Sequence, residues 1–155
     1  MEYYSIIMPR IDKNDHKLIE LLRENSKLPV QELAQRIGLP PTTVHNRIKK
    51  LEQSGIVKGY TAVVDDAKLG RGVTAYVLIT AVSRTPAGVR VAQEDIAREV
   101  RGIGADEVSI ATGGADLIAR LHAKDIAELN DIVVRKLRNI DGVDKTQTMI
   151  VLSTF

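Results

Sequence analysis

The sequence predicts an α+β protein in two parts: an N-terminal winged helix-turn-helix, followed by a ferredoxin-like βαββαβ domain. In the first part, apolar side chains recur at helical spacing in three short segments separated by breaks. In the second part, apolar and β-branched runs alternate with helical patterns in the order β-α-β-β-α-β. We therefore expect domains over residues 1–64 and 74–155. A linker over 65–73 joins them, where two glycines and mixed charges interrupt both patterns.

The first domain is expected to hold three helices. They cover residues 12–24, 30–37 and 41–54. Gly38 is a natural C-terminal stop for the second helix, and Pro41 can occupy the first position of the third without losing a needed N–H. Only Leu39 and Pro40 lie between these two helices, and so tight a connection predicts a helix-turn-helix.

Strand signals begin after the third helix. Residues 56–65, "IVKGYTAVVD", carry two β-rich runs around Gly59 and predict a small hairpin or wing. In the second domain we expect a strand at 73–82, a helix at 88–101, strands at 106–112 and 116–123, a helix at 125–140 and a strand at 143–154. This order predicts an antiparallel sheet with two helices on one face. The first and last strands are apolar on both sides, so we infer that a second sheet covers the open face in a homodimer.

Composition excludes several classes of function. The chain of 155 residues has no cysteine, which excludes disulfides, thiolate catalysis and cysteine-ligated zinc. Its three histidines, His16, His45 and His122, are scattered and lack metal-ligand spacing. No P-loop, GxSxG or HExxH motif is present, and no apolar run approaches the ~20 residues that span a bilayer. We expect no catalytic residues, metal, cofactor or membrane partner, and no signal peptide in "MEYYSIIMP".

The basic charge lies in the first third of the chain. Residues 1–60 hold 10 Lys/Arg and 7 Asp/Glu, so a polyanionic partner would meet the protein there. On the third expected helix, Val44, Ile48 and Leu51 share one apolar face. The residues outside this face are Asn46 roughly opposite, Thr42, Lys49 and Lys50 beside it, and Thr43, His45 and Arg47 on the shoulders.

These seven side chains suit double-stranded DNA, because "TTVHNRIKK" contains hydroxyls, an amide and cations but no carboxylate. Asn46 and Arg47 can make bidentate contacts with base edges in the major groove, while threonine and lysine suit phosphates and methyl groups. A solvated basic helix face is the alternative interpretation. The position of the third expected helix after a two-residue turn favours DNA binding, since the second helix of a helix-turn-helix motif enters the major groove.

Over nearly its whole length the chain resembles the Lrp/AsnC regulators, also called feast/famine proteins. The resemblance is carried by residues 11–70, "IDKNDHKLIELLRENSKLPVQELAQRIGLPPTTVHNRIKKLEQSGIVKGYTAVVDDAKLG", followed by the βαββαβ half. Its most specific part is "TTVHNRIKKLEQSGIVKGYTAVVD", which matches the family's recognition helix and wing. One departure is Pro40, where many members have a serine that could cap the helix. The cap is then expected from Thr42 or Thr43.

The resemblance implies a cytoplasmic, nucleoid-associated transcriptional regulator. It also implies dimerisation through the sheets, assembly to higher oligomers such as octamers, and a small effector, often an amino acid, bound between dimers. The family's ligand loop has a glycine–x–x–aspartate form, here Gly113 to Asp116. The glycines Gly113 and Gly114 allow a ligand to approach the backbone, and Asp116 could hold an α-ammonium group. Thr146 and Thr148 share one face of a strand and offer hydroxyls to a carboxylate or amide.

Other interpretations remain open. The glycines can serve a hairpin turn alone, and the threonines can reflect β-propensity. Sirohaem decarboxylases share the two-domain architecture, although one candidate histidine and an aromatic content of 3% disfavour a tetrapyrrole pocket. An architectural protein that coats DNA without sequence preference is a third class, which the base-reading face of Asn46 and Arg47 disfavours.

Overall fold

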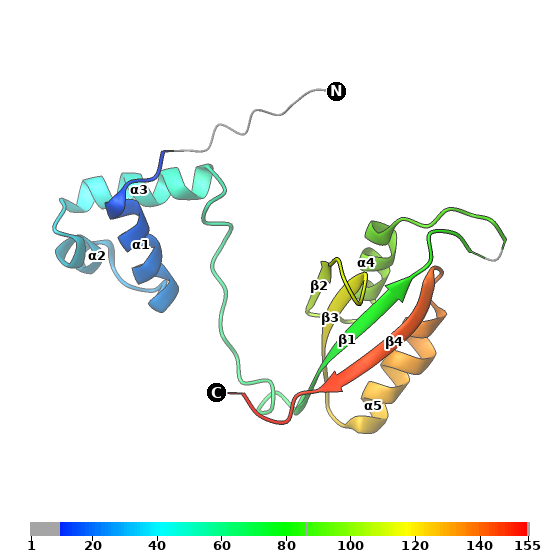
Figure 1. The fold of residues 1–155 in the computed structure, drawn as a ribbon. Coiled ribbons are helices and arrows are strands. Elements are labelled where there is room, and N and C mark those ends of the chain that lie inside the picture. The colour runs from blue at the N-terminus through cyan, green and yellow to red at the C-terminus, as the bar shows by residue number, and fades with distance from the viewer. Residues whose placement is uncertain (1–9, 86, 155) are drawn as a thin grey trace. The chain divides into compact units, whose positions relative to one another are not determined.

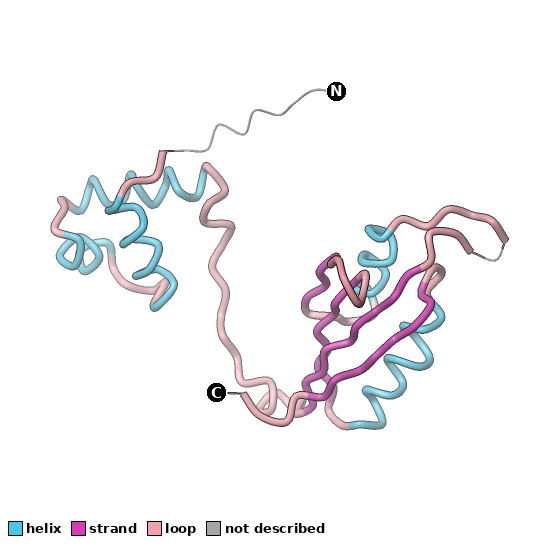
Figure 2. The backbone as a smooth tube through the Cα atoms, in the orientation of Figure 1, coloured by secondary structure: helices cyan, strands magenta, loops and turns pink. Residues whose placement is uncertain are grey.

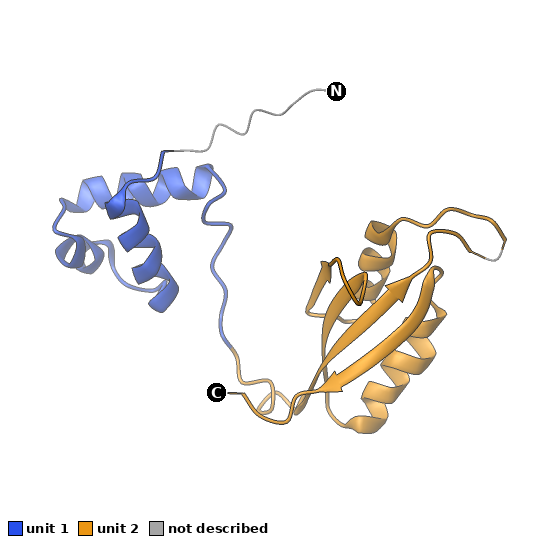
Figure 3. Ribbon diagram, in the orientation of Figure 1, with its two compact units in different colours: residues 1–63 blue, residues 64–155 orange. Residues whose placement is uncertain are grey.

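The computed structural model describes residues 10–85 and 87–154. The chain forms two compact units, residues 1–63 and 64–155 (Figure 3). Between α3 and β1 the chain is loop and turn (Figure 2). Each unit has its own hydrophobic core, and each is described separately below.

Three helices form the first unit: α1 (Lys13–Glu24), α2 (Val30–Ile37) and α3 (Pro41–Gln53) (Figure 1). Asp12 caps α1 in a capping box with Asp15, and Gly38 ends α2 in the left-handed conformation with φ 79°. The buried side chains are Leu18, Leu33, Ala34, Val44 and Leu51. They come from all three helices, so the predicted helix-turn-helix is confirmed.

The small hairpin or wing predicted over 56–65 has no strand in this structure, which forms that segment as a loop (Figure 2). Gly59 does not adopt a positive φ, so the tight turn that would reverse the chain is not made. A two-stranded hairpin is marginal without a third strand or a helix to cover it, which accounts for the difference. The start of the segment is nevertheless attached to α3. The Val57 N–H donates to the Leu51 carbonyl at 3.1 Å, and the Tyr60 hydroxyl donates to Glu52 at 2.8 Å.

The second unit is a four-stranded antiparallel sheet with two helical segments on one face (Figure 1). Its elements are β1 (Val73–Ala81), α4 (Gln93–Gly102), β2 (Glu107–Ile110), β3 (Leu117–Ala123), α5 (Ile126–Asn130) and β4 (Val143–Ile150). After α5 the chain continues as a π-helical segment, Asp131–Lys136, and a 3-10 turn, Leu137–Asn139. The strand order β2-β3-β1-β4 confirms the ferredoxin-like fold.

The alternation of side chains along β1 and the pairing of its residues show which residues lie on each face of the sheet. Ala75, Val77 and Ile79 of β1 are fully buried with the helices in one core. The alternate positions lie on the other face, which no helix covers (Figure 1). There Tyr76 and its β4 partner Met149 are 39% and 45% exposed. The structure thus has an apolar face open to solvent, as the sequence predicts.

The helix expected over 88–101 begins at Gln93 instead. The five residues before it turn back along the end of β1. Gly88 has φ 81°, the Thr85 N–H donates to the Val89 carbonyl at 2.8 Å, and the Val91 N–H donates to the Ser83 carbonyl at 3.1 Å. Valine's preference for strands, together with the glycine turn, favours this local pairing over a longer helix.

Candidate nucleic-acid interface and effector site

The face of α3 that is turned away from the core is polar and positively charged. Its exposed side chains are Thr42, His45, Asn46, Lys49 and Lys50, and Thr43 is half-buried. Val44 and Leu51 anchor the opposite face in the core. No acidic residue occurs in α3 before Glu52. The helix therefore presents an amide, hydroxyls and cations to solvent without a competing carboxylate of its own.

The beginning of α3 differs from the prediction. Neither Thr42 nor Thr43 caps the helix: it starts after Pro40 with no side-chain hydrogen bond to its first turn. The Val44 N–H donates to the Pro40 carbonyl at 3.1 Å, so the first turn is held by the backbone and by the φ that proline fixes at Pro41. The backbone N–H groups of Thr42 and Thr43 thus have no side-chain acceptor in the helix. Free N–H groups at the beginning of a helix can bind an anionic group.

Arg47 does not extend freely from α3 as the other predicted residues do. Its Nη1 lies 2.6 Å from Asp15 Oδ1 and 2.8 Å from Asp12 Oδ2, and its side chain is only 27% exposed. The hydrogen bond to Asp15, followed by the one to Asp12, raises the pKa of Arg47 above its ordinary value. The Asp15 N–H and Arg47 together hold the pKa of the Asp12 carboxyl below its usual range. This ion pair ties α3 to the beginning of α1. The base-reading role of Arg47 stays a prediction.

Arg10 is a residue that sequence reasoning missed. It is exposed and, with Thr43, Asn46 and Lys50 of α3, lines a shallow cavity of about 340 Å³ above the Arg47 ion pair. The carboxylates of Asp12 and Asp15 line the same cavity and are paired with Arg47, so Arg10 and Lys50 are two further cations beside Asn46. Helical periodicity could not have found it, because Arg10 precedes the first helix and reaches α3 only through the packing of α1.

In the second unit, Asp116 lines a cavity of about 450 Å³ at the end of β1, together with residues 81–83 and 90–94. Its carboxylate already has two partners: Oδ2 accepts from the Ala81 N–H at 2.8 Å, and Oδ1 accepts from Gln93 Nε2 at 3.1 Å. The side chain therefore braces the end of β1 against the beginning of α4.

The other predicted effector residues are not gathered in that cavity. Gly113 has φ 125° and makes the turn between β2 and β3 with Gly114. Thr146 and Thr148 pair with Ile79 and Val77 across β1 and β4, and Arg138 Nε donates to the Thr146 hydroxyl at 2.9 Å. Thr146 and the glycine turn lie at the same end of the sheet. A joint role in binding a ligand stays a prediction.

The described residues contain no helix long and apolar enough to cross a membrane, and no cluster of histidine and carboxylate side chains suited to a metal ion.

A helix-turn-helix whose second helix has no acidic residue before Glu52, joined to a ferredoxin-like domain, defines a class of DNA-binding regulator. Residues 11–58 match the family model for winged helix-turn-helix DNA-binding, and residues 74–155 match the Lrp/AsnC ligand binding domain. The chain belongs to the Lrp/AsnC family of DNA-binding transcriptional regulators, which confirms the resemblance seen in the sequence.

Known relatives are similar to this protein in sequence or structure over almost the full chain. An uncharacterized HTH-type transcriptional regulator of Pyrococcus horikoshii is 37% identical over 145 residues, covering 92% of this chain and 94% of its own. The HTH-type transcriptional regulator FL11 of Pyrococcus furiosus is 36% identical over 142 residues, covering 92% and 89%. Among solved structures, a transcriptional regulator of Neisseria meningitidis in complex with L-Met has a TM-score of 0.82 at 28% identity, covering 93% and 91%. AsnC of E. coli has a TM-score of 0.74 at 26% identity, covering 94% of both chains.

Proposed function

We propose that the protein is a sequence-specific regulator that reads DNA with α3 and responds to a small effector bound by its second unit. The observation that carries the DNA-reading half is the exposed face of α3, where Asn46 lies between the cations Lys49 and Lys50. An asparagine amide can pair with the N6 and N7 of adenine, and lysines neutralise phosphates. The unblocked amides of Thr42 and Thr43 suit a further phosphate.

Arg10 extends this surface beyond α3, and Arg47 holds the helix in place for it. The ion pair of Arg47 with Asp15 fixes the rotation of α3 about its axis, which decides which side chains reach base edges. We assign the contacts with DNA to Thr42, Thr43, His45, Asn46, Lys49 and Lys50, joined by Arg10.

The active species in this proposal is a dimer or a higher oligomer. Tyr76 and Met149 on the uncovered face of the sheet give a second copy an apolar surface to bury. A two-fold dimer presents two copies of α3, so its DNA site is a rough palindrome.

The proposed effector is a small molecule with a cationic group, such as an amino acid. Support comes from the match to a ligand binding domain and from the similarity to a regulator solved with L-Met. In this chain the carboxylate of Asp116 is the candidate partner for an ammonium group, at the rim of a 450 Å³ cavity. Gly113, Gly114, Thr146 and Thr148 lie at or near the same end of the sheet and would meet the effector where two dimers adjoin.

The names of the relatives, all transcriptional regulators, favour a protein without enzymatic activity. The proposal is tested by selecting DNA fragments from a random library with the purified full chain. Recovery of one palindromic motif supports a sequence-specific regulator. Recovery of unrelated fragments in proportion to their length would instead support an architectural protein. The effector is tested by measuring the affinity for the selected DNA, and the mass of the oligomer, in the presence of each of the twenty amino acids.

A further inference from the structure

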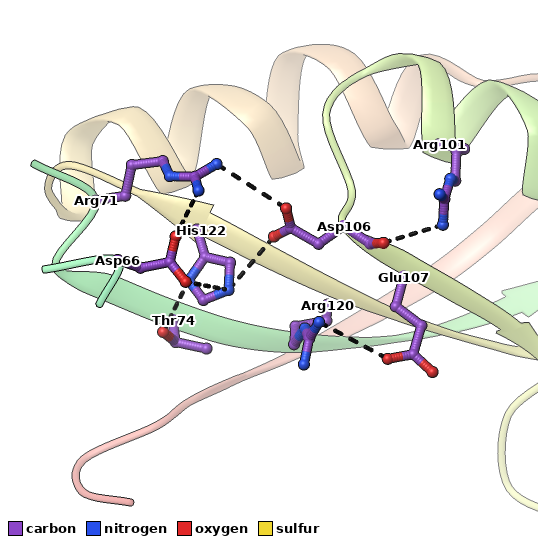
Figure 4. Close-up of polar contacts among 8 residues, drawn as sticks. All are labelled: Asp66, Arg71, Thr74, Arg101, Asp106, Glu107, Arg120 and His122. Carbon is purple, nitrogen blue, oxygen red and sulfur yellow. Dashed lines mark hydrogen bonds and ion pairs between the residues drawn. The ribbon is translucent and has the colours of Figure 1, made fainter. Parts of the chain in front are cut away.

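A cluster of charged side chains attaches the segment before β1 to the sheet of the second unit (Figure 4). His122, on β3, is 10% exposed, and its Nε2 lies 3.5 Å from Asp66 Oδ2 and 3.3 Å from Asp106 Oδ2. Arg71 pairs with the same Asp66 and lies 3.9 Å from Asp106. Asp66 and Arg71 belong to the connecting segment, whereas Asp106 and His122 belong to the sheet and its approach. The cluster therefore joins two parts of the chain that are far apart in sequence.

The chemistry of the cluster fixes the orientation of the imidazole. Thr74 Oγ1 lies 3.0 Å from His122 Nδ1, and Thr74 is the cross-strand partner of His122. We assign the N–H to Nε2, because that nitrogen faces two carboxylates and Nδ1 can then accept from the threonine hydroxyl. Asp106 Oδ2 is buried and finds no hydrogen-bond partner among the described residues, so its contact with His122 is what offsets its burial.

Backbone hydrogen bonds make the connecting segment compact at the same place. The Arg71 N–H donates to the Asp66 carbonyl at 2.8 Å, and the Leu69 N–H donates to the Asp65 and Asp66 carbonyls at 3.2 and 3.1 Å. Residues 66–70 thus form a closed turn whose first aspartate is tied to the sheet. An exposed ion pair alone would stabilise this little, but His122 and its partners form a network that is partly withdrawn from water.

We propose that Asp66, Arg71, Asp106 and His122 form a latch that shortens the connection between the two units and so limits which spacing of DNA half-sites a dimer can bridge. The inference rests on the proposed DNA-binding function. In the first unit the last side-chain hydrogen bond of the segment, among the residues that the structure describes, is that of the Tyr60 hydroxyl to Glu52. With the latch closed, residues 61–65 connect this point to the latch; with it open, residues 61–72 connect it to β1.

The difference in reach is large on the scale of DNA. Seven further residues, 66–72, add up to roughly 24 Å at about 3.4 Å per extended residue. Half-sites one helical turn apart are separated by about 34–36 Å. Opening the latch in both subunits therefore lets the dimer accept spacings that differ by a substantial part of a turn. The latch makes these four residues determinants of specificity although none of them belongs to α3.

The test compares Asp66→Ala with Asp65→Asn in the full chain. Asp65 precedes the turn and carries the same charge, but its ion-pair partner is the exposed Lys68 at 3.4 Å. The Lys68 N–H donates to Asp65 Oδ1 at 3.2 Å, and asparagine keeps an acceptor for it, so this control removes the charge without removing that hydrogen bond. Cleavage by trypsin reports the state of the latch, because Lys68 lies in the turn, Arg71 is a latch residue, and Lys58 precedes both. We expect Asp66→Ala to accelerate cleavage after Lys68 and Arg71 severalfold, with cleavage after Lys58 unchanged. The Asp65 variant should match the wild type.

The functional measurement uses the selected palindrome with its half-sites moved apart in single base-pair steps. Wild type and Asp65→Asn should bind within a narrow range of spacings. In Asp66→Ala the difference in affinity between the best and the worst spacing should be severalfold smaller. The affinity of this variant for an isolated half-site should equal that of the wild type. His122→Gln, which changes the sheet side of the latch, should reduce the difference between spacings as well.

Identical cleavage in the Asp66 and Asp65 variants would overturn the latch. Faster cleavage with an unchanged spacing profile would overturn its role in specificity. If the wild type bound no DNA site at all, the proposed function would fail together with the spacing role, and the cleavage pattern would still report whether the turn is attached to the sheet.

Discussion

Replacing Arg47 by alanine should loosen the first unit rather than simply remove a DNA contact. Arg47 Nη1 lies 2.6 Å from Asp15 Oδ1, and the Asp15 side chain is only 7% exposed. A hydrogen bond between charged groups contributes about 1.5–3 kcal/mol, and an exposed pair contributes about 0–1 kcal/mol. With one partner buried and Arg47 27% exposed, we expect a loss of about 2 kcal/mol. That free energy corresponds to roughly 30-fold faster hydrogen exchange of amides protected by opening of this unit.

The assay is hydrogen exchange of the full chain, followed in peptides from α1 and α3, with the strands of the second unit as an internal reference. Arg36→Ala is the matched control, since Arg36 pairs with Glu32 at the same distance, 2.6 Å, but both side chains are more than 40% exposed. It should change exchange by less than about threefold. Equal exchange in the two variants would refute the positioning role. Loss of discrimination between DNA sites with unchanged exchange would return Arg47 to the base-reading role that its place in the sequence suggests.

Three further predictions concern acid stability, assembly and the effector. The lowered pKa of Asp12 means that its contribution to stability is present above the unfolded value of 3.8 and is lost as the pH falls through the folded value. Circular dichroism should thus find a weaker acid dependence below about pH 4 in Asp12→Asn, and an identical dependence would contradict the assignment. Met149→Glu puts a charge on the open face of the sheet, so sedimentation at micromolar concentration should find a smaller oligomer than the wild type; unchanged mass would exclude this face as the interface. Asp116→Asn keeps an acceptor for the Ala81 N–H but removes the charge, so calorimetry should find effector binding lost and ligand-free DNA affinity retained; effector binding that survives would mean that the pocket lies elsewhere.

Much of the architecture follows from local patterns. The apolar spacing of Leu18, Leu33 and Val44 places three helices around one core, and the order of strands and helices after residue 73 identifies the ferredoxin-like unit. These features are predictable because each depends on residues a few positions apart. The same local reasoning extends the fourth helix too far towards Gly88, where pairing between residues 83–85 and 89–91 outweighs helical propensity.

The site is predicted less completely, because its remaining features depend on contacts between distant residues. Helical projection correctly puts Asn46 and Lys50 on the exposed side of α3. It cannot reveal that Asp15, 32 positions earlier, takes the guanidinium of Arg47, or that Arg10 lies beside the same helix. His122 is similar: read alone it is an isolated histidine on a strand, and only the fold brings it to Asp66 and Asp106.

The reading of DNA by α3 is tested most directly by a mobility-shift titration of the selected palindrome and a scrambled duplex at several salt concentrations. Asn46→Ala should cost about 1–3 kcal/mol on the palindrome and leave the scrambled duplex almost unaffected. Lys49→Ala and Lys50→Ala should instead weaken binding to both duplexes and lower the salt slope by about one each. Wild-type affinity and salt dependence in all three variants would contradict the assignment of this helix to DNA.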